Sequence, residues 1–139
     1  MTVAYAITPI ITWLLVGPIK FLINSARSRQ WAFNLIGNGG FPSNHSAVVT
    51  STATLIALRE GISHPAFGVA VAFALIVMID ANSLRQHVGR QAATINKMAL
   101  QLSPQPGEPL RERMGHSMVE IIGGIATGVL VGYAINSIF

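Results

Sequence analysis

The sequence has no cysteine among its 139 residues and carries few charged or aromatic side chains. Without cysteine, disulfide bonds and thiolate metal sites are excluded. Only 10% of the residues are charged, against roughly 25% in an ordinary soluble domain. A small soluble domain has too much surface to cover with so few charges, so the composition indicates a membrane protein.

The few charges are mainly basic. Nine lysines and arginines stand against five acidic residues, for a formal net charge of +4. In a soluble protein this balance would suggest nucleic-acid binding. Here the basic residues are too few, and have too few aromatic neighbours, to form a nucleic-acid-binding surface. We expect no nucleic-acid partner. Membrane lipids and phosphate-bearing molecules are the better match.

Apolar runs predict an all-α membrane bundle that forms one domain over residues 1–139. About four transmembrane helices are expected, at residues 1–19, 43–58, 61–79 and about 115–139. The first is expected to be a retained helix, because no basic residue precedes it and no small-residue cleavage site is evident. The second is rich in Ser, Thr and Ala, so it can span only if other helices shield it.

The remaining segments are polar. We expect a surface connection at residues 24–40. The spacing of apolar residues predicts an amphipathic helix at residues 82–102, which either lies in the interface or extends the third span. Three prolines within residues 103–109 end that helix. In the last span, glycines at four-residue spacing predict a face for close helix packing: Gly124, Gly128 and Gly132.

Basic residues are concentrated on one predicted side of the membrane. The loops at 24–43 and 80–115 fall together there, whereas the opposite side holds Arg59 alone. The positive-inside rule then places these loops in the cytoplasm and both termini outside. We expect an integral protein of a bacterial inner membrane or an organelle membrane, with any site near these loops on the cytoplasmic face.

The unusual polar residues at the ends of the predicted spans all fall at this same membrane end. They are Lys20, Arg27, Ser43, His45, Asp80, Arg85, His116 and Glu120. Ionisable groups near hydrocarbon are costly and indicate function by default, so their gathering predicts one site. Taken singly, each has an ordinary interpretation: a helix cap, a headgroup contact, a snorkelling lysine, or a carboxylate paired with an arginine.

Together these residues suit a phosphate. Ser43 is placed to cap the second span, and Gly115–His116 opens the last, so two helix N-termini could face an anion. Two histidines at the same place could attack phosphorus and protonate a leaving oxygen. Glu120 lies one turn after His116 and can hold one ring nitrogen, leaving the other free.

Three short patterns carry a resemblance to a family. Lys20 and Arg27 have the spacing K-x6-R, "PSNH" contains Ser43 and His45, and "HSMVE" spaces His116 and Glu120 as H-x3-acid. This set resembles the type 2 phosphatidic acid phosphatases, which are related to vanadium haloperoxidases and carry K-x6-R-P, P-S-G-H and S-R-x5-H-x3-D. The stretches "GGFPSNHSA", "DANSLRQHVGRQA" and "GHSMVEIIGG" are most similar to the short, divergent branch.

The resemblance implies a role for each matching residue. His116 would be the nucleophile that forms a phosphohistidine, Glu120 would orient it, and His45 would protonate the leaving group. Ser43 would bind a phosphate oxygen, and no metal or other cofactor would be needed. The phosphate clamp would comprise Lys20 and Arg27.

The chain departs from the family pattern at several positions. Asn44 replaces the glycine before His45, Ser28 replaces the proline after Arg27, and Glu replaces Asp at position 120. Leu110 occupies the position of the third-motif arginine, so either Arg85 or Arg111 must take its place, and we favour Arg85. The family core has six transmembrane spans. The four spans expected here would form a thinner bundle, which a homodimer could complete.

The leading hypothesis is therefore an integral membrane phosphatase acting on a lipid phosphomonoester or diphosphate. Phosphatidic acid, phosphatidylglycerophosphate and isoprenoid diphosphates all combine an anionic head with an apolar tail. The alternative is a non-catalytic membrane protein that binds phosphorylated lipids with the same basic pocket. A transporter or channel subunit is disfavoured, because the polar residues gather at one face instead of lining a path through the bilayer.

Overall fold

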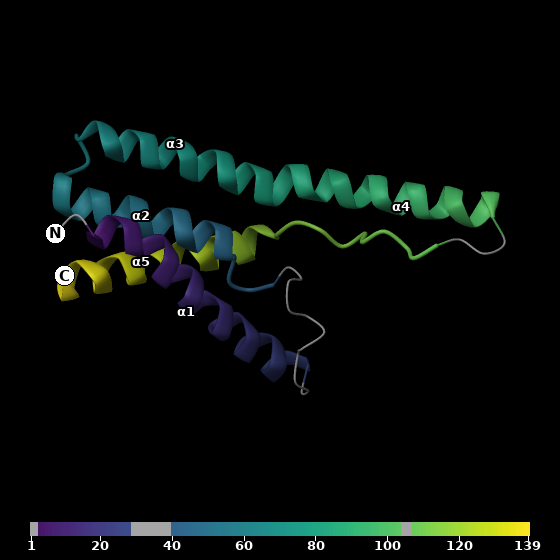
Figure 1. Cartoon of the computed structure of the whole chain (residues 1–139), viewed down its shortest axis with the longest axis horizontal. Coiled ribbons are helices and arrows are strands. Elements are labelled where there is room, and N and C mark those ends of the chain that lie inside the picture. The colour runs from purple at the N-terminus through teal and green to yellow at the C-terminus, as the bar shows by residue number, and fades with distance from the viewer. Residues whose placement is uncertain (1–2, 29–39, 104–106) are drawn as a thin grey trace.

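A computed structural model describes residues 3–28, 40–103 and 107–139, and the described part is all-helical without strands. The side chains of Arg27 and Ser28 are outside the described set. A π-helical turn, η2 (Asp80–Leu84), joins the third and fourth helices. Figure 1 shows the five α-helices: α1 (Val3–Ser28), α2 (Asn44–Glu60), α3 (Pro65–Ile79), α4 (Arg85–Leu102) and α5 (Met118–Ile138). The all-α prediction is confirmed.

Within residues 3–28, 40–103 and 107–139, three helical stretches are long and apolar enough to cross a membrane. They are Val3–Ala26, Pro65–Leu102 and Met118–Ile138. The fourth predicted span corresponds to α2, which has 17 residues, is less apolar, and is not among these candidates. Because α2 packs against α1, α3 and α5, its serines and threonines are shielded by other helices. Three of the four predicted spans are thus supported, and the total of four is not.

The most extensive contact between described helices joins α2 to α5. A Cβ atom at Gly124 would lie 2.5 Å from the carbonyl oxygen of Ser43, and one at Gly128 would lie 2.5 Å from that of Ala47. Contacts this short leave no room for a side chain, so the glycines let the two backbones approach. Gly124, Gly128 and Gly132 are all buried, which confirms the predicted packing face.

Several predicted boundaries were wrong. Residues 24–28 continue α1 instead of joining the surface connection, because this stretch contains neither glycine nor proline to end a helix. The remainder of that predicted connection, residues 29–39, lies outside the described residues. The last helix begins at Met118 and not at 115, because Ser117 caps it while Gly115 has a φ of +92°.

The amphipathic helix extends the third span instead of lying in the interface. Figure 1 shows α4 continuing the line of α3 as an arm beyond the rest of the bundle. Residues 107–117 then return along this arm, where the side chain of Asn96 bonds both the N–H and the carbonyl of Leu110 at 2.8 Å. The start of α1 and the end of α5 lie together at the opposite end of the bundle, which agrees with the prediction that both are on one side.

Candidate active site

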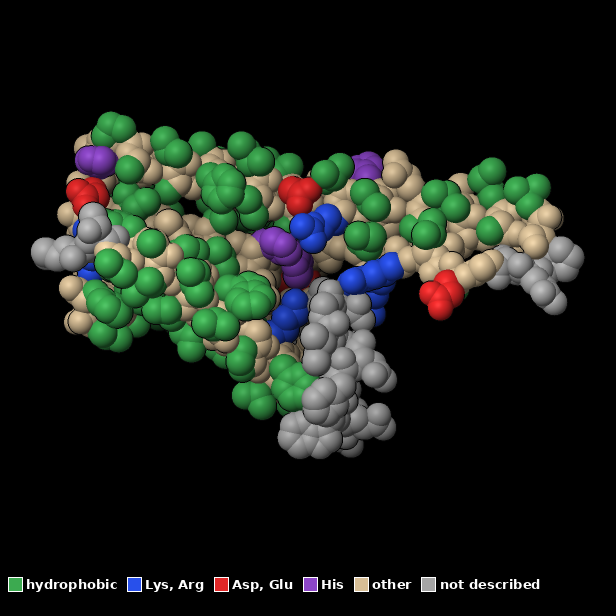
Figure 2. Space-filling view, viewed as in Figure 1, with side chains coloured by type: hydrophobic (Ala, Val, Ile, Leu, Met, Phe, Trp, Pro, Cys, Tyr) green, Lys and Arg blue, Asp and Glu red, His purple; other side chains and the backbone are tan. Residues whose placement is uncertain are grey.

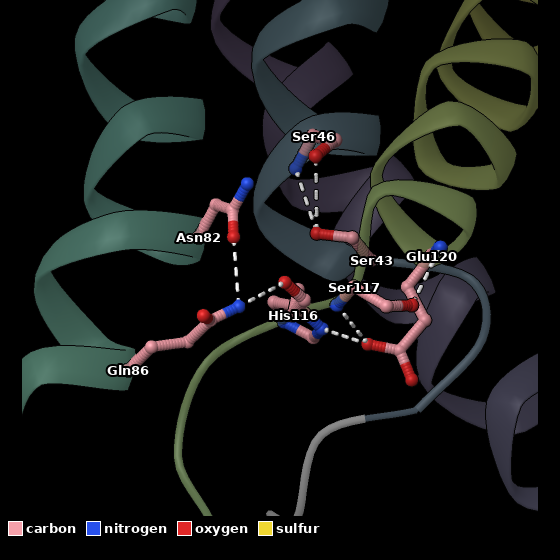
Figure 3. A network of polar contacts seen from close by, with 7 residues as sticks. All are labelled: Ser43, Ser46, Asn82, Gln86, His116, Ser117 and Glu120. Carbon is pink, nitrogen blue, oxygen red and sulfur yellow. Dashed lines mark hydrogen bonds and ion pairs between the residues drawn. The ribbon is translucent and has the colours of Figure 1, made fainter. Parts of the chain in front are cut away.

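His116 and Glu120 form a hydrogen-bonded pair at the start of α5. His116 Nδ1 lies 2.9 Å from Glu120 Oε2, and the histidine is only 6% exposed. The same carboxylate oxygen accepts a 3.1 Å hydrogen bond from the N–H of Ser117, whose hydroxyl in turn accepts from the N–H of Glu120 (Figure 3). A carboxylate at Nδ1 favours the tautomer with its proton there, which leaves the Nε2 lone pair unprotonated.

The π-helical turn η2 helps to hold His116 in place. In a regular α-helix the N–H of Arg85 would bond to the carbonyl of Ala81, but here it bonds to the carbonyls of Asp80 and Asn82. The carbonyl of Ala81 instead accepts a 2.9 Å hydrogen bond from the N–H of His116. Single π turns often occur at functional sites, and this one links the α3–α4 junction to the start of α5.

A side-chain amide adds a second link between α4 and His116. Gln86 Nε2 donates to Asn82 Oδ1 at 2.8 Å and to the carbonyl of His116 at 3.4 Å (Figure 3). A Cβ atom at Gly115 would lie 2.9 Å from Gln86 Cγ, so a side chain there would displace this link. We did not single out Gln86 or Asn82 from the sequence, although both lie in the matching stretch "DANSLRQHVGRQA".

Ser43 connects the starts of α2 and α5. Its hydroxyl accepts from the N–H of Ser46 at 3.3 Å, which confirms the predicted N-cap. Its own N–H donates to the carbonyl of Glu120 at 2.9 Å. The residue is fully buried. The structure thus gives Ser43 a structural role, and its predicted contact with phosphate remains a prediction.

His45 lies in the first turn of α2 and faces His116. The two ring centroids are 5.8 Å apart, with the ring planes at 62°. His45 Nδ1 and the neighbouring Asn44 Oδ1 are buried, and neither has a hydrogen-bond partner among the described residues. Buried polar atoms usually have partners, so these two atoms are available to a bound molecule or water.

Basic side chains surround the two histidines (Figure 2). The charges of Arg85 and Lys20 both act on His45, and the charge of Arg111 acts on Lys20. Lys20 also packs beside the loop before α2, where a Cβ atom at Gly40 would lie 3.2 Å from its Cε. The structure therefore brings Lys20, Arg85 and Arg111 to one region. Arg27 cannot be compared, because its side chain lies outside the described residues.

Arg85 is paired with an acidic residue. Its Nε lies 3.1 Å from Asp80 Oδ2, and both side chains are more than a third exposed. This pair confirms the ordinary interpretation of Asp80 as the partner of an arginine. Arg111 is exposed and donates from Nε to the carbonyl of Arg113 at 3.3 Å. Both candidates for the missing third-motif arginine thus lie near the site.

The electrostatics of the site favour a neutral His45, which lies outside the three candidate spans. Burial lowers the pKa of His45, and the charges of Arg85, His116 and Lys20 lower it further, while Asp80 acts in the opposite direction. A bound phosphate would add negative charge and oppose this shift. No group of three or more acidic or histidine side chains arranged to hold a metal ion occurs among the described residues.

Comparison with known proteins places this arrangement in context. The profile described as the "Divergent PAP2 family" matches residues 2–131, which include every predicted site residue. The chain is also similar to the "Uncharacterized membrane protein YuiD" of Bacillus subtilis (strain 168). The two are 35% identical over 128 residues, and the match covers 82% of this chain and 79% of that protein. No solved structure matches.

Proposed function

The chain belongs to the divergent PAP2 family, and from this premise we propose that it is an integral membrane phosphatase that hydrolyses a lipid phosphomonoester or diphosphate. The observation that carries the proposal is the geometry of His116. Its Nδ1 is held by Glu120 at 2.9 Å while its ring faces that of His45 at 5.8 Å. One imidazole is thereby prepared to attack, and a second lies beside it to transfer a proton.

The proposed reaction has two steps. Nε2 of His116 attacks phosphorus, the bond to the lipid oxygen breaks, and protonated His45 donates its proton to that oxygen. The enzyme is left with a phosphohistidine and a neutral His45. Water then attacks phosphorus, His45 accepts the proton of that water, and the bond between phosphorus and Nε2 breaks to release inorganic phosphate.

The proposed phosphate contacts come from Lys20, Arg85 and Arg111, assisted by the N-terminal ends of α2 and α5. Charge builds on the oxygens of a phosphoryl group as it is transferred, so fixed cations and helix N-termini stabilise the transition state. Arg27 would join them, as its position in the K-x6-R spacing suggests. Asn44, which replaces the family glycine, offers its unpaired Oδ1 to a water or a protonated phosphate oxygen.

A lipid is the proposed substrate because the site lies at one end of the apolar helices. A phosphorylated headgroup could reach the histidines while its apolar tail stayed in hydrocarbon. The positive-inside distribution of basic residues supports a cytoplasmic site. Phosphatidic acid, phosphatidylglycerophosphate and isoprenoid diphosphates each have this chemistry.

The direct test is phosphate release from a panel of these three substrates by purified protein in lipid vesicles. Wild type is compared with His116→Ala and His45→Ala. His64→Ala serves as the matched control, because His64 caps α3 at the end of the bundle away from the site. We expect loss of activity in the first two variants only. Substrate binding without turnover by wild type would instead support the non-catalytic lipid-binding alternative.

A further inference from the structure

The arm formed by α4 carries an apolar stripe that nothing in the described structure covers. The stripe, named here the α4 seam, has residues spaced alternately by four and three positions. They are Leu84, Val88, Gln91, Ile95, Met98 and Leu102. All six are exposed, and the five apolar ones range from 40% at Val88 to 82% at Leu102. This alternation is the heptad pattern that places side chains along one seam of a coiled coil.

A different face of α4 is already occupied. Gly89 and Ala92 are buried, and Asn96 holds Leu110 of the returning segment. A Cβ atom at Gly89 would lie 2.2 Å from the carbonyl oxygen of Glu112, so that segment lies directly against the helix. The α4 seam is about a quarter turn or more around the helix from this covered face.

From the lengths of the helices we place the seam outside the bilayer core from Val88 onward. Together, α3, η2 and α4 contain 38 residues, a length of about 57 Å, whereas a bilayer core is about 30 Å thick. The 15 residues of α3 and the 5 of η2 together span about 30 Å and so match the thickness of the core. The next helix, α4, continues in line beyond the bundle, where Figure 2 shows hydrophobic side chains along the arm. A row of leucine, isoleucine and methionine in water is costly to leave uncovered.

We propose that the α4 seam pairs with the same seam of a second copy of this chain to form a parallel, two-stranded coiled coil. The membrane supports this occupant, because two copies inserted in the same orientation carry their arms side by side and pointing the same way. Confinement to one bilayer also raises their effective concentration. This proposal does not depend on the proposed phosphatase activity.

The residue types in the seam favour two strands. Val88 and Ile95 occupy a positions, where β-branched residues favour parallel dimers, and Leu84 and Met98 occupy d positions. Gln91 is the one polar residue in the seam, and such a residue fixes register at some cost in stability. The charges of Arg90 and Lys97 fall at c positions, away from the seam, so they do not repel across the pair.

The absence of native cysteine allows a direct crosslinking test. Met98→Cys places a thiol in the seam, and Leu100→Cys places one at an apolar position about half a turn away that is at least as exposed. Under mild oxidation in membranes, we expect Met98→Cys to form a disulfide-linked dimer and Leu100→Cys to remain mainly monomeric. Equal crosslinking of both, no crosslinking of either, or crosslinking of Met98→Cys to a different protein would overturn the proposal.

A charge placed in the seam provides a second measurement. Ile95→Asp is expected to raise the dimer dissociation constant about 100-fold, because an unpaired carboxylate would be buried between the two arms. Leu100→Asp is expected to leave that constant unchanged. Gln91→Leu should tighten association. Circular dichroism and a monodisperse elution profile check that each variant folds, and a folded Ile95→Asp that dimerises like wild type would contradict the pairing.

Discussion

The carboxylate of Glu120 binds His116 Nδ1 and caps its own helix with the same oxygen, at 2.9 and 3.1 Å. The capping box of α5 therefore also sets the orientation of the proposed nucleophile. The reciprocal hydrogen bonds of this capping box hold the pair in place. This dual role allows the structural and chemical contributions of Glu120 to be separated by substitution.

Glu120→Gln should remove the charge while keeping the cap, since glutamine also forms capping boxes. We expect kcat on a lipid phosphate to fall by about 100- to 10,000-fold, by analogy with loss of the orienting carboxylate in serine proteases. The melting temperature should change little. Glu108→Gln, an exposed position in the returning segment, is the control. A fully active Glu120→Gln protein would exclude an orienting role for the carboxylate.

Substitution of single arginines should identify the residue that replaces the third-motif arginine. We expect Arg85→Gln to reduce the rate about 100-fold or more, as does removal of a single transition-state donor elsewhere. Arg111→Gln should cost less, because Arg111 is exposed, whereas the charge of the half-buried Arg85 acts on His45. Arg90→Gln, whose side chain contacts His87, is the control. A larger loss in Arg111→Gln would reverse this assignment.

Anion binding should be coupled to proton uptake by His45. The pKa of His45 is lowered by burial and by the charges of Arg85, His116 and Lys20, with Asp80 opposing them. A bound anion raises the pKa of His45. At a pH between the pKa without the anion and the pKa with it, binding takes up a proton, so the affinity for the anion falls as pH rises.

Calorimetry with sulfate, which remains a dianion near neutral pH, in buffers of different ionisation enthalpy measures this uptake. His45→Asn should abolish it, whereas His87→Asn should not. Unchanged proton uptake in His45→Asn would assign the proton to another group.

The contact between α2 and α5 should be sensitive to single methyl groups. Gly128→Ala places a Cβ atom 2.5 Å from the carbonyl oxygen of Ala47, so the two helices must separate. We expect a loss of about 1–3 kcal/mol in the free energy of unfolding, measured as a lower melting temperature in detergent. Gly68→Ala in α3 meets nothing within 4 Å and should be neutral or slightly stabilising. Equal stability of the two variants would refute tight packing.

The sequence predicted those parts of the structure that depend on short spacing. The i,i+4 spacing predicted the contact between His116 and Glu120, and the spacing of the glycines predicted the face of α5 that packs against another helix. The helix start at Ser43 followed from its capping chemistry. Because successive apolar helices cross the membrane in opposite directions, their polar ends were predicted to meet at one end of the bundle.

Other features depend on tertiary context and were missed. The π turn at Asp80–Leu84 has no hydropathy signal, because it changes which carbonyl is free and not which residues are apolar. The continuation of α1 to Ser28 was also missed, since polar residues end a hydrophobic run without ending a helix. Similarly, α2 has too little hydrophobicity to be judged alone, and its burial depends on the three helices around it.

The central claim is that His116 is phosphorylated during turnover. The most direct measurement is rapid acid-free quenching of protein incubated with a lipid substrate carrying labelled phosphorus, followed by detection of an acid-labile, base-stable protein phosphate. We expect label on wild type and none on His116→Ala. Phosphate release by wild type with no label on His116, or turnover undiminished in His116→Ala, would contradict the account.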